Sequence, residues 1–179
     1  MAQIDDMTSA RLMTTEYERI KEEQKTRIGF RDNLIYATLA SMAAVISATL
    51  SAHDTAYLLL LPPVSVVLGW TYLVNDEKIS SIGRYVRTEL APRLMEATGE
   101  SAPVFGWESA HRSDRYRISR KYSQLIVDLV TFCLAPSVAF AIFWSSSSVT
   151  ALLMVASIAE AVFVGGLLVQ IVLYADLKM

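Results

Sequence analysis

Four long stretches of the chain consist almost entirely of apolar residues, and charged residues lie between them. Two stretches, 33–52 and 57–75, have no charged residue; 122–144 contains only Asp128, and 150–173 only Glu160. The hydrocarbon core of a bilayer requires about 20 apolar residues in helical form. We therefore predict an all-α integral membrane protein with four transmembrane helices, at these four ranges.

The remaining segments divide the chain further. We predict a cytoplasmic amphipathic helix at 1–32, transmembrane hairpins at 33–75 and 122–173, a cytoplasmic helix with a basic loop at 76–121, and a cytoplasmic tail at 174–179. The composition alone, 53% apolar and 19% charged, resembles that of a soluble protein, but only as an average. A soluble four-helix bundle is excluded because uncharged helices of this length would be insoluble. The single cysteine, Cys133, excludes an internal disulfide.

The cationic residues indicate the orientation. Of 16 Lys and Arg residues, six precede residue 33, nine lie within 76–121 and one is Lys178, so the short loops 51–56 and 145–149 have none. Positively charged loops stay in the cytoplasm. We predict a multi-pass protein of the plasma membrane, with the lipid bilayer as its surroundings and both termini in the cytoplasm.

Two cytoplasmic segments have helical periodicity. Met13, Tyr17, Ile20 and Ile28 recur near the helical period, so the first segment is expected to continue into the first span as one long helix. A second helical stripe of apolar residues follows the second span and consists of Ile79, Ile82, Val86, Leu90 and Leu94. Pro92 lies near the end of this predicted helix, and Thr98-Gly99 ends it. The two stripes bury themselves either against each other or against neighbouring subunits.

The segment 99–121 has no apolar period at first and is basic at its end. Its aromatic residues, Phe105 and Trp107, are expected to rest at the membrane interface or on the helix pair. A basic cluster follows, which either anchors the topology or binds anionic lipid headgroups; it consists of Arg112, Arg115, Arg117, Arg120 and Lys121.

Small residues and prolines mark the spans. The small side chains of the first span share one face and are expected to serve in helix packing or oligomerisation; they include Ala37, Ser41, Ala44 and Ala48. Pro62-Pro63 predicts a kink or a short start before the true second helix, and Pro136 interrupts the third span.

Glu160 lies near the bilayer midplane, where an ionised carboxylate costs several kcal/mol, about 3 on cautious scales. No span contains a Lys or Arg to pair with it, so the carboxyl is protonated, paired with another group or facing water. Glu160, Asp128, Gln124 and Gln170 are our candidates for a pore or a proton relay. The alternatives are a neutral, hydrogen-bonded Glu160 and an Asp128 that lies at the interface near the basic cluster.

Motifs for catalysis are missing from the sequence. It has no phosphate-binding glycine loop, no dinucleotide fingerprint and no nucleophile elbow, and His53 and His111 fall on opposite sides of the predicted membrane. We expect no enzyme activity, no cofactor, no metal site and no nucleic-acid partner.

The helix containing Glu16-Tyr17-Glu18-Arg19-Ile20, followed by two spans, a charged insert and two more spans, resembles small four-span membrane proteins of bacterial antiphage-defence operons. This resemblance covers the layout of the whole chain and contains no diagnostic motif. It implies an effector that disrupts the membrane, or a sensor that passes a signal to a cytosolic partner.

Three functions are compatible with these features. The first is a homo-oligomeric channel or pore-forming effector, gated through its cytoplasmic helices. The second is a membrane-anchored sensing or scaffold protein that docks a cytosolic protein. The third is a small proton-coupled transporter, for which Pro62-Pro63 and Pro136 would supply broken helices.

Overall fold

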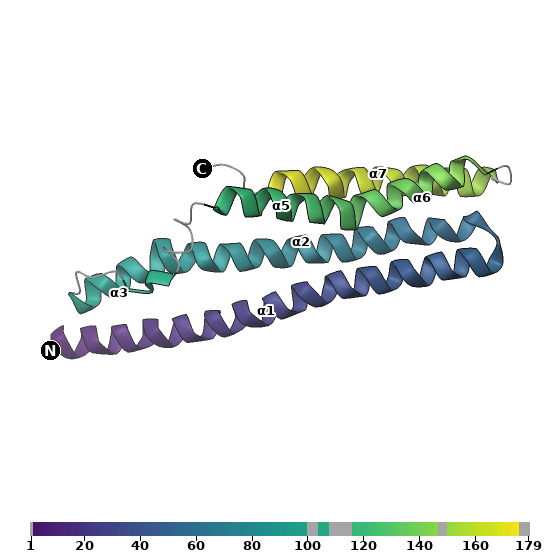
Figure 1. The fold of residues 1–179 in the computed structure, drawn as a ribbon. Helices are drawn as coiled ribbons and strands as arrows, with labels where there is room; N and C mark the ends of the chain where they lie inside the picture. The colour runs from purple at the N-terminus through teal and green to yellow at the C-terminus, as the bar shows by residue number, and fades with distance from the viewer. Residues whose placement is uncertain (1, 100–103, 108–115, 147–149, 176–179) are drawn as a thin grey trace. The chain divides into compact units, whose positions relative to one another are not determined.

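The computed structural model describes residues 2–99, 104–107, 116–146 and 150–175, with side chains from Thr8 onward and without that of Arg117 (Figure 1). These ranges are helical apart from short turns and contain no strand, which confirms the all-α prediction. Four helices are long and apolar enough to cross a membrane.

The first half of the chain forms two long helices with a short connection. α1 covers Ala2–Ala52, and His53 ends it with a φ of 52°. A single 3₁₀ segment, η1 (Thr55–Leu60), follows, and α2 covers Leu61–Tyr85. Pro62 and Pro63 therefore fall in the first turn of α2, where a missing N–H breaks no helical hydrogen bond. Of the two expected outcomes, the short start before the true helix is the one observed.

Each of two prolines inside a helical run is preceded by a π-helical segment. η2 (Val86–Leu90) comes before α3 (Ala91–Thr98), which contains Pro92; η3 (Val130–Leu134) comes before α6 (Ala135–Trp144), which contains Pro136. A proline ring collides with the carbonyl group four residues earlier, and a wider π turn relieves that collision. The chain thus continues as helix past both prolines. α3 ends at Thr98 with Gly99 in the left-handed conformation, as the sequence predicts.

The second half contains α5 (Arg117–Leu129), η3, α6 and α7 (Ala151–Tyr174). α6 lies beside α7 (Figure 1). The Thr150 side chain caps α7 by accepting a hydrogen bond from the Leu153 amide at 3.4 Å.

The chain forms two compact units, whose boundaries fall inside α1 and α2. The helix-pair unit consists of residues 1–30 and 75–117, and the four-span unit of residues 31–74 and 118–179.

The four-span unit has a layered apolar core. One layer joins Leu34 of α1, Tyr72 of α2, Phe132 of η3 and Leu167 of α7. Two further layers lie toward the other end of these helices; they contain Val45, Leu58, Leu61 and Ala139, and Leu59, Phe140, Phe143 and Val164. Gly69 lies where α2, η3 and α7 meet, because a Cβ at this position would be 2.8 Å from Leu167 Cδ2 and 3.0 Å from Phe132 Cδ1.

The helix-pair unit buries most of the two predicted stripes inside one chain. Val86, Leu90 and Leu94 are buried, and Ile79 and Ile82 are partly buried. On α1 the inward positions are Met13, Tyr17, Ile20, Gln24 and Arg27, spaced alternately by three and four residues. The prediction was wrong for Ile28, which is 39% exposed, because this spacing brings Arg27 rather than Ile28 to the inner face.

Candidate functional site

Glu160 lies on the inward face of α7, within the four-span unit. The positions of Ser157, Val164, Leu167 and Ile171, all buried, lie on the same side of the helix as Glu160. The Glu160 Oε2 atom is buried and has no hydrogen-bond partner among the residues that the structure describes.

The nearest hydroxyl on the same helix is committed elsewhere. Ser157 Oγ donates to the Met154 carbonyl at 2.8 Å and accepts from Trp144 Nε1 at 2.9 Å. Because a serine hydroxyl has one proton, Ser157 has none left to donate to Glu160. The Trp144 contact instead ties the end of α6 to α7, where Phe140 stacks on Trp144 with 5.4 Å between ring centroids.

A second buried oxygen atom in this unit, Ser65 Oγ, also has no hydrogen-bond partner. Ser65 is 0% exposed and lies on α2, one turn before Gly69. Sequence reasoning missed Ser65, although its place between Pro62-Pro63 and Gly69 was a usable signal. Thr38, also 0% exposed, differs because its hydroxyl donates to the Leu34 carbonyl at 2.7 Å.

The other relay candidates lie toward the opposite end of the spans. Asp128 is only 8% exposed and has a polar or electrostatic partner. Gln124, likewise partnered, and Gln170 are partly buried. In the same unit the Arg31 guanidinium lies over the Tyr72 ring at 6.0 Å and contacts Asp32 Oδ1 at 3.3 Å. Polar groups are thus present at two depths of the four-span unit.

The predicted packing residues of the first span lie on and beside the inner face. Ser41 and Ala48 are partly buried, whereas Ala37 and Ala44 are exposed. The exposed pair remains available to lipid or to another copy of the chain. Gly165 and Gly166 on α7 are exposed too, and a Cβ at either would meet no atom within 4 Å.

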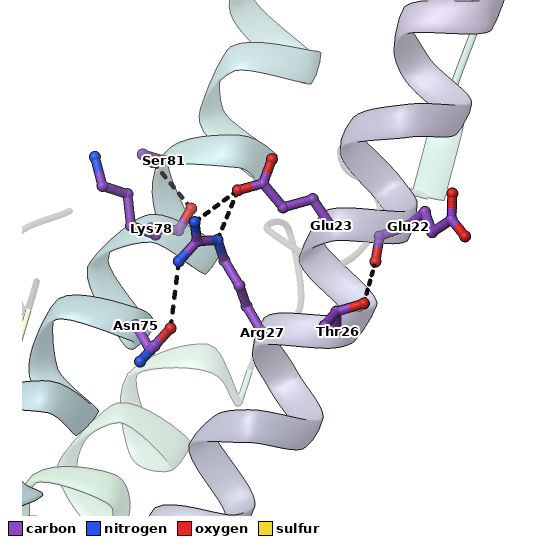
Figure 2. Close-up of polar contacts among 7 residues, drawn as sticks. All are labelled: Glu22, Glu23, Thr26, Arg27, Asn75, Lys78 and Ser81. Carbon is purple, nitrogen blue, oxygen red and sulfur yellow. Dashed lines mark hydrogen bonds and ion pairs between the residues drawn. The ribbon is translucent and has the colours of Figure 1, made fainter.

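The helix-pair unit has a polar layer between α1 and α2. Figure 2 shows Arg27 extending from α1 toward α2: its Nη1 donates to Asn75 Oδ1 at 3.3 Å, and its Nη2 lies 2.7 Å from Glu23 Oε1 on its own helix. Gln24 Nε2 donates to the Ile79 carbonyl at 3.0 Å. Asn75 is 8% exposed and was not among the predicted site residues, because only its contact across the helix pair distinguishes it.

Two aromatic contacts complete this unit. The Tyr85 hydroxyl donates to Glu16 Oε1 at 2.6 Å, and this hydrogen bond to a carboxylate raises the pKa of Tyr85. The Phe105 ring stacks on Tyr17 with 3.8 Å between centroids. Of the two expected locations for Phe105, the structure therefore has the helix pair.

The basic cluster is covered only in part. Arg112 and Arg115 lie outside the described residues, as does the side chain of Arg117. Arg120 is exposed and Lys121 partly buried at the start of α5. Within the ranges that the structure describes, no three His, Cys, Asp or Glu side chains gather as a metal site would require.

The chain matches no protein-family model, and neither a curated protein nor a solved structure matches it.

Proposed function

We propose that this protein is a homo-oligomeric ion channel or pore-forming effector of the bacterial inner membrane, gated through its helix-pair unit, with a role in antiphage defence. The observation that carries the proposal is Glu160: an acid near the middle of an apolar helix, with a buried oxygen atom that has no hydrogen-bond partner among the described residues. A carboxyl in hydrocarbon needs a proton, an ion or a polar group as partner. A permeating ion, or a polar group of a second copy, supplies that partner.

The exposed apolar surface supports assembly. Only 17% of the most apolar window is buried inside the chain for α1, and the same holds for α7. The outer face of α7 contains large exposed side chains together with Gly165 and Gly166, which would let another helix approach closely. Chains with four spans typically build an ion pathway by assembling several copies. The exposed apolar faces of α1 and α7 are suited to such assembly.

The continuity of the helices supports gating through the helix-pair unit. α1 and α2 both contribute residues to the two units without a break in the helix at the boundary. The inner-face residues Ile82 and Val86 pack within a single chain and are not available to a partner. A trigger would therefore act on the outer surface of the helix pair or on its polar layer. With the loops that lack Lys and Arg outside, the helix pair lies in the cytoplasm.

The test is ion flux from proteoliposomes that contain the purified protein, together with the oligomer size in the same detergent. Glu160→Gln removes the ionisable group and keeps its shape, and Glu18→Gln, an exposed acid of the helix pair, is the matched control. We expect flux from an oligomer, reduced at least about tenfold by Glu160→Gln and unchanged by Glu18→Gln. Flux that is the same in all three proteins would rule out this role of Glu160, and saturable, substrate-dependent flux would indicate the proton-coupled transporter instead.

The orientation is tested separately, in whole cells. In a Cys133→Ala background, an impermeant maleimide should label Ser51→Cys, exposed in the last turn of α1, and leave Glu18→Cys unlabelled. Labelling of Glu18→Cys alone would reverse the topology and place the helix pair outside. A monomeric, non-conducting protein with the expected topology would favour the scaffold function over the channel.

A further inference from the structure

Ser65 lies on the inner face of α2, at mid-depth of the four-span unit. One turn before Ser65, Leu61 shares a core layer with Ala139 of α6; one turn after it, Gly69 meets Phe132 of η3. α2 and α6 run in opposite directions past these two contacts. Ser65 therefore lies level with Ala135 and Pro136, half-way between them.

Pro136 leaves one backbone carbonyl of this helix, about one turn before it, without its helical donor. Pro136 has no N–H, so the carbonyl one turn earlier, that of Phe132 or, in the wider π turn, that of Thr131, receives no hydrogen bond from position 136. Other span hydroxyls satisfy themselves on the preceding turn of their own helix: Ser137 donates to Cys133 O at 2.7 Å and Ser41 to Ala37 O at 2.8 Å. Ser65 does not, although it is fully buried.

Glu160 lies about one turn further along the same bundle. Ser157 bonds to Trp144, and Leu167 lies beside Phe132 at Gly69, so Glu160 is level with residues 140–141 of α6. Its axial offset from the level of Ser65 is about 7.5 Å, five residues at 1.5 Å each. Hydrogen-bonded water molecules, spaced about 2.8 Å apart, would cover that distance in three steps. Ser65 Oγ and Glu160 Oε2 are the two side-chain oxygen atoms recorded as buried and unpartnered among the described residues.

We propose that a water molecule joins the Ser65 hydroxyl to the carbonyl freed by Pro136, and that this hydrated site passes protons to and from Glu160. The inference rests on the proposed function and names its ion: the proton. The side chains that lie against Gly69, those of Leu167 and Phe132, are apolar and offer no ligand to a metal ion. A proton needs only hydrogen-bonded groups in sequence.

The transfer balances without a further reactant. The protonated Glu160 carboxyl gives its proton to the adjoining water molecule, which releases one of its own protons to the Ser65 hydroxyl. Ser65 releases its original proton to the water molecule at the carbonyl freed by Pro136, and that water passes a proton on to the solvent. The carboxylate then takes up a proton from the solvent on the other side of the membrane, so only O–H bonds form and break.

Thermal unfolding of Ser65→Ala in detergent tests the hydrated site, because the direction of the change in Tm differs between a hydrated and an unpartnered hydroxyl. A hydroxyl bonded through water stabilises the fold, so its removal lowers Tm; a hydroxyl buried without a partner costs free energy, so its removal raises Tm. We expect a lowered Tm. A raised Tm overturns the proposal, whatever the flux. Ser137→Ala, which removes a hydroxyl bonded within its own helix, is the matched control.

Proton flux into proteoliposomes under a potassium diffusion potential, followed with a pH-sensitive dye, tests the relay. We expect Ser65→Ala to reduce flux at least about tenfold, Ser65→Thr, which keeps the hydroxyl, to restore part of it, and Ser137→Ala to conduct normally. If Glu160→Gln abolishes flux while Ser65→Ala conducts like the wild type, the channel function is supported and the relay through Ser65 is refuted. If the flux of the wild type is carried by K⁺ or Na⁺ and not by protons, the relay falls likewise.

Discussion

Gly69→Ala is the substitution for which the structure gives the sharpest expectation. An alanine Cβ at this position would be 2.8 Å from Leu167 Cδ2 and 3.0 Å from two atoms of the Phe132 ring. Phe132 is 1% exposed, and its ring lies 5.2 Å from that of Tyr72, so it cannot move without disturbing the core. The Leu167 side chain would have to turn away and the Phe132 ring to shift by a few tenths of an ångström.

The magnitude follows from two opposing terms. Forcing an additional methyl group into a packed core costs about 1–3 kcal/mol. Replacing glycine by alanine inside a helix gains about 0.5–1 kcal/mol. We therefore expect Gly69→Ala to reduce the free energy of unfolding by about 1 kcal/mol, within the range of about 0–2.5 kcal/mol that the two terms allow.

Gly165→Ala provides a matched control with the opposite sign. A Cβ at Gly165 would meet no atom of the chain within 4 Å, so only the helix-propensity gain of about 0.5–1 kcal/mol remains. Loss of helical circular dichroism on heating or on titration with a denaturing detergent measures both variants. Equal stability of the two variants would refute the packing argument. A Gly165→Ala variant that loses its oligomeric state would instead identify this face as covered by a second copy.

Two further predictions concern single hydrogen bonds. Glu16→Gln should lower the pKa of Tyr85, which tyrosinate absorbance measures with Tyr85→Phe as the reference. Because the hydrogen bond to Glu16 raises this pKa, its stabilising contribution is present below the ordinary pKa of tyrosine and disappears as the pH rises through the raised value. An unshifted titration of Tyr85 in Glu16→Gln would show that the hydrogen bond is not formed. Trp144→Phe removes the donor to Ser157 and should lower the free energy of unfolding by about 0.5–1.5 kcal/mol, whereas Trp70→Phe on exposed surface should have little effect; equal losses would argue against the Trp144 bond.

The sequence was sufficient to predict features that depend on local chemistry. The predicted first span ends at Ala52, where α1 ends, and the predicted fourth span, 150–173, differs by one residue at each end from α7, Ala151–Tyr174. Pro62-Pro63 placed the start of α2, and Thr98-Gly99 the end of α3. These signals work because proline, glycine and charge act on the helix that contains them.

Features that depend on a partner helix were missed or left open. Periodicity assigned Ile28 to the inner face, but the register of α1 against α2 brings Arg27 there, opposite Asn75. Gly69 and Ser65 received no role, because their significance arises from Phe132 and Pro136, more than sixty residues later. The sequence located Glu160 near the midplane, and the structure added that its Oε2 has no partner.

The sequence by itself determined that this chain is helical, where its apolar helices begin and end, and which loops contain the positive charge. Tertiary structure decided which face of each helix points inward, how Pro92 and Pro136 are accommodated by π turns, and which polar atoms remain unpaired. The physical reason is that hydrophobicity and helix-breaking are properties of single residues and their immediate neighbours. Packing and hydrogen bonding are relations between two segments, and they are fixed only when the register between the helices is fixed.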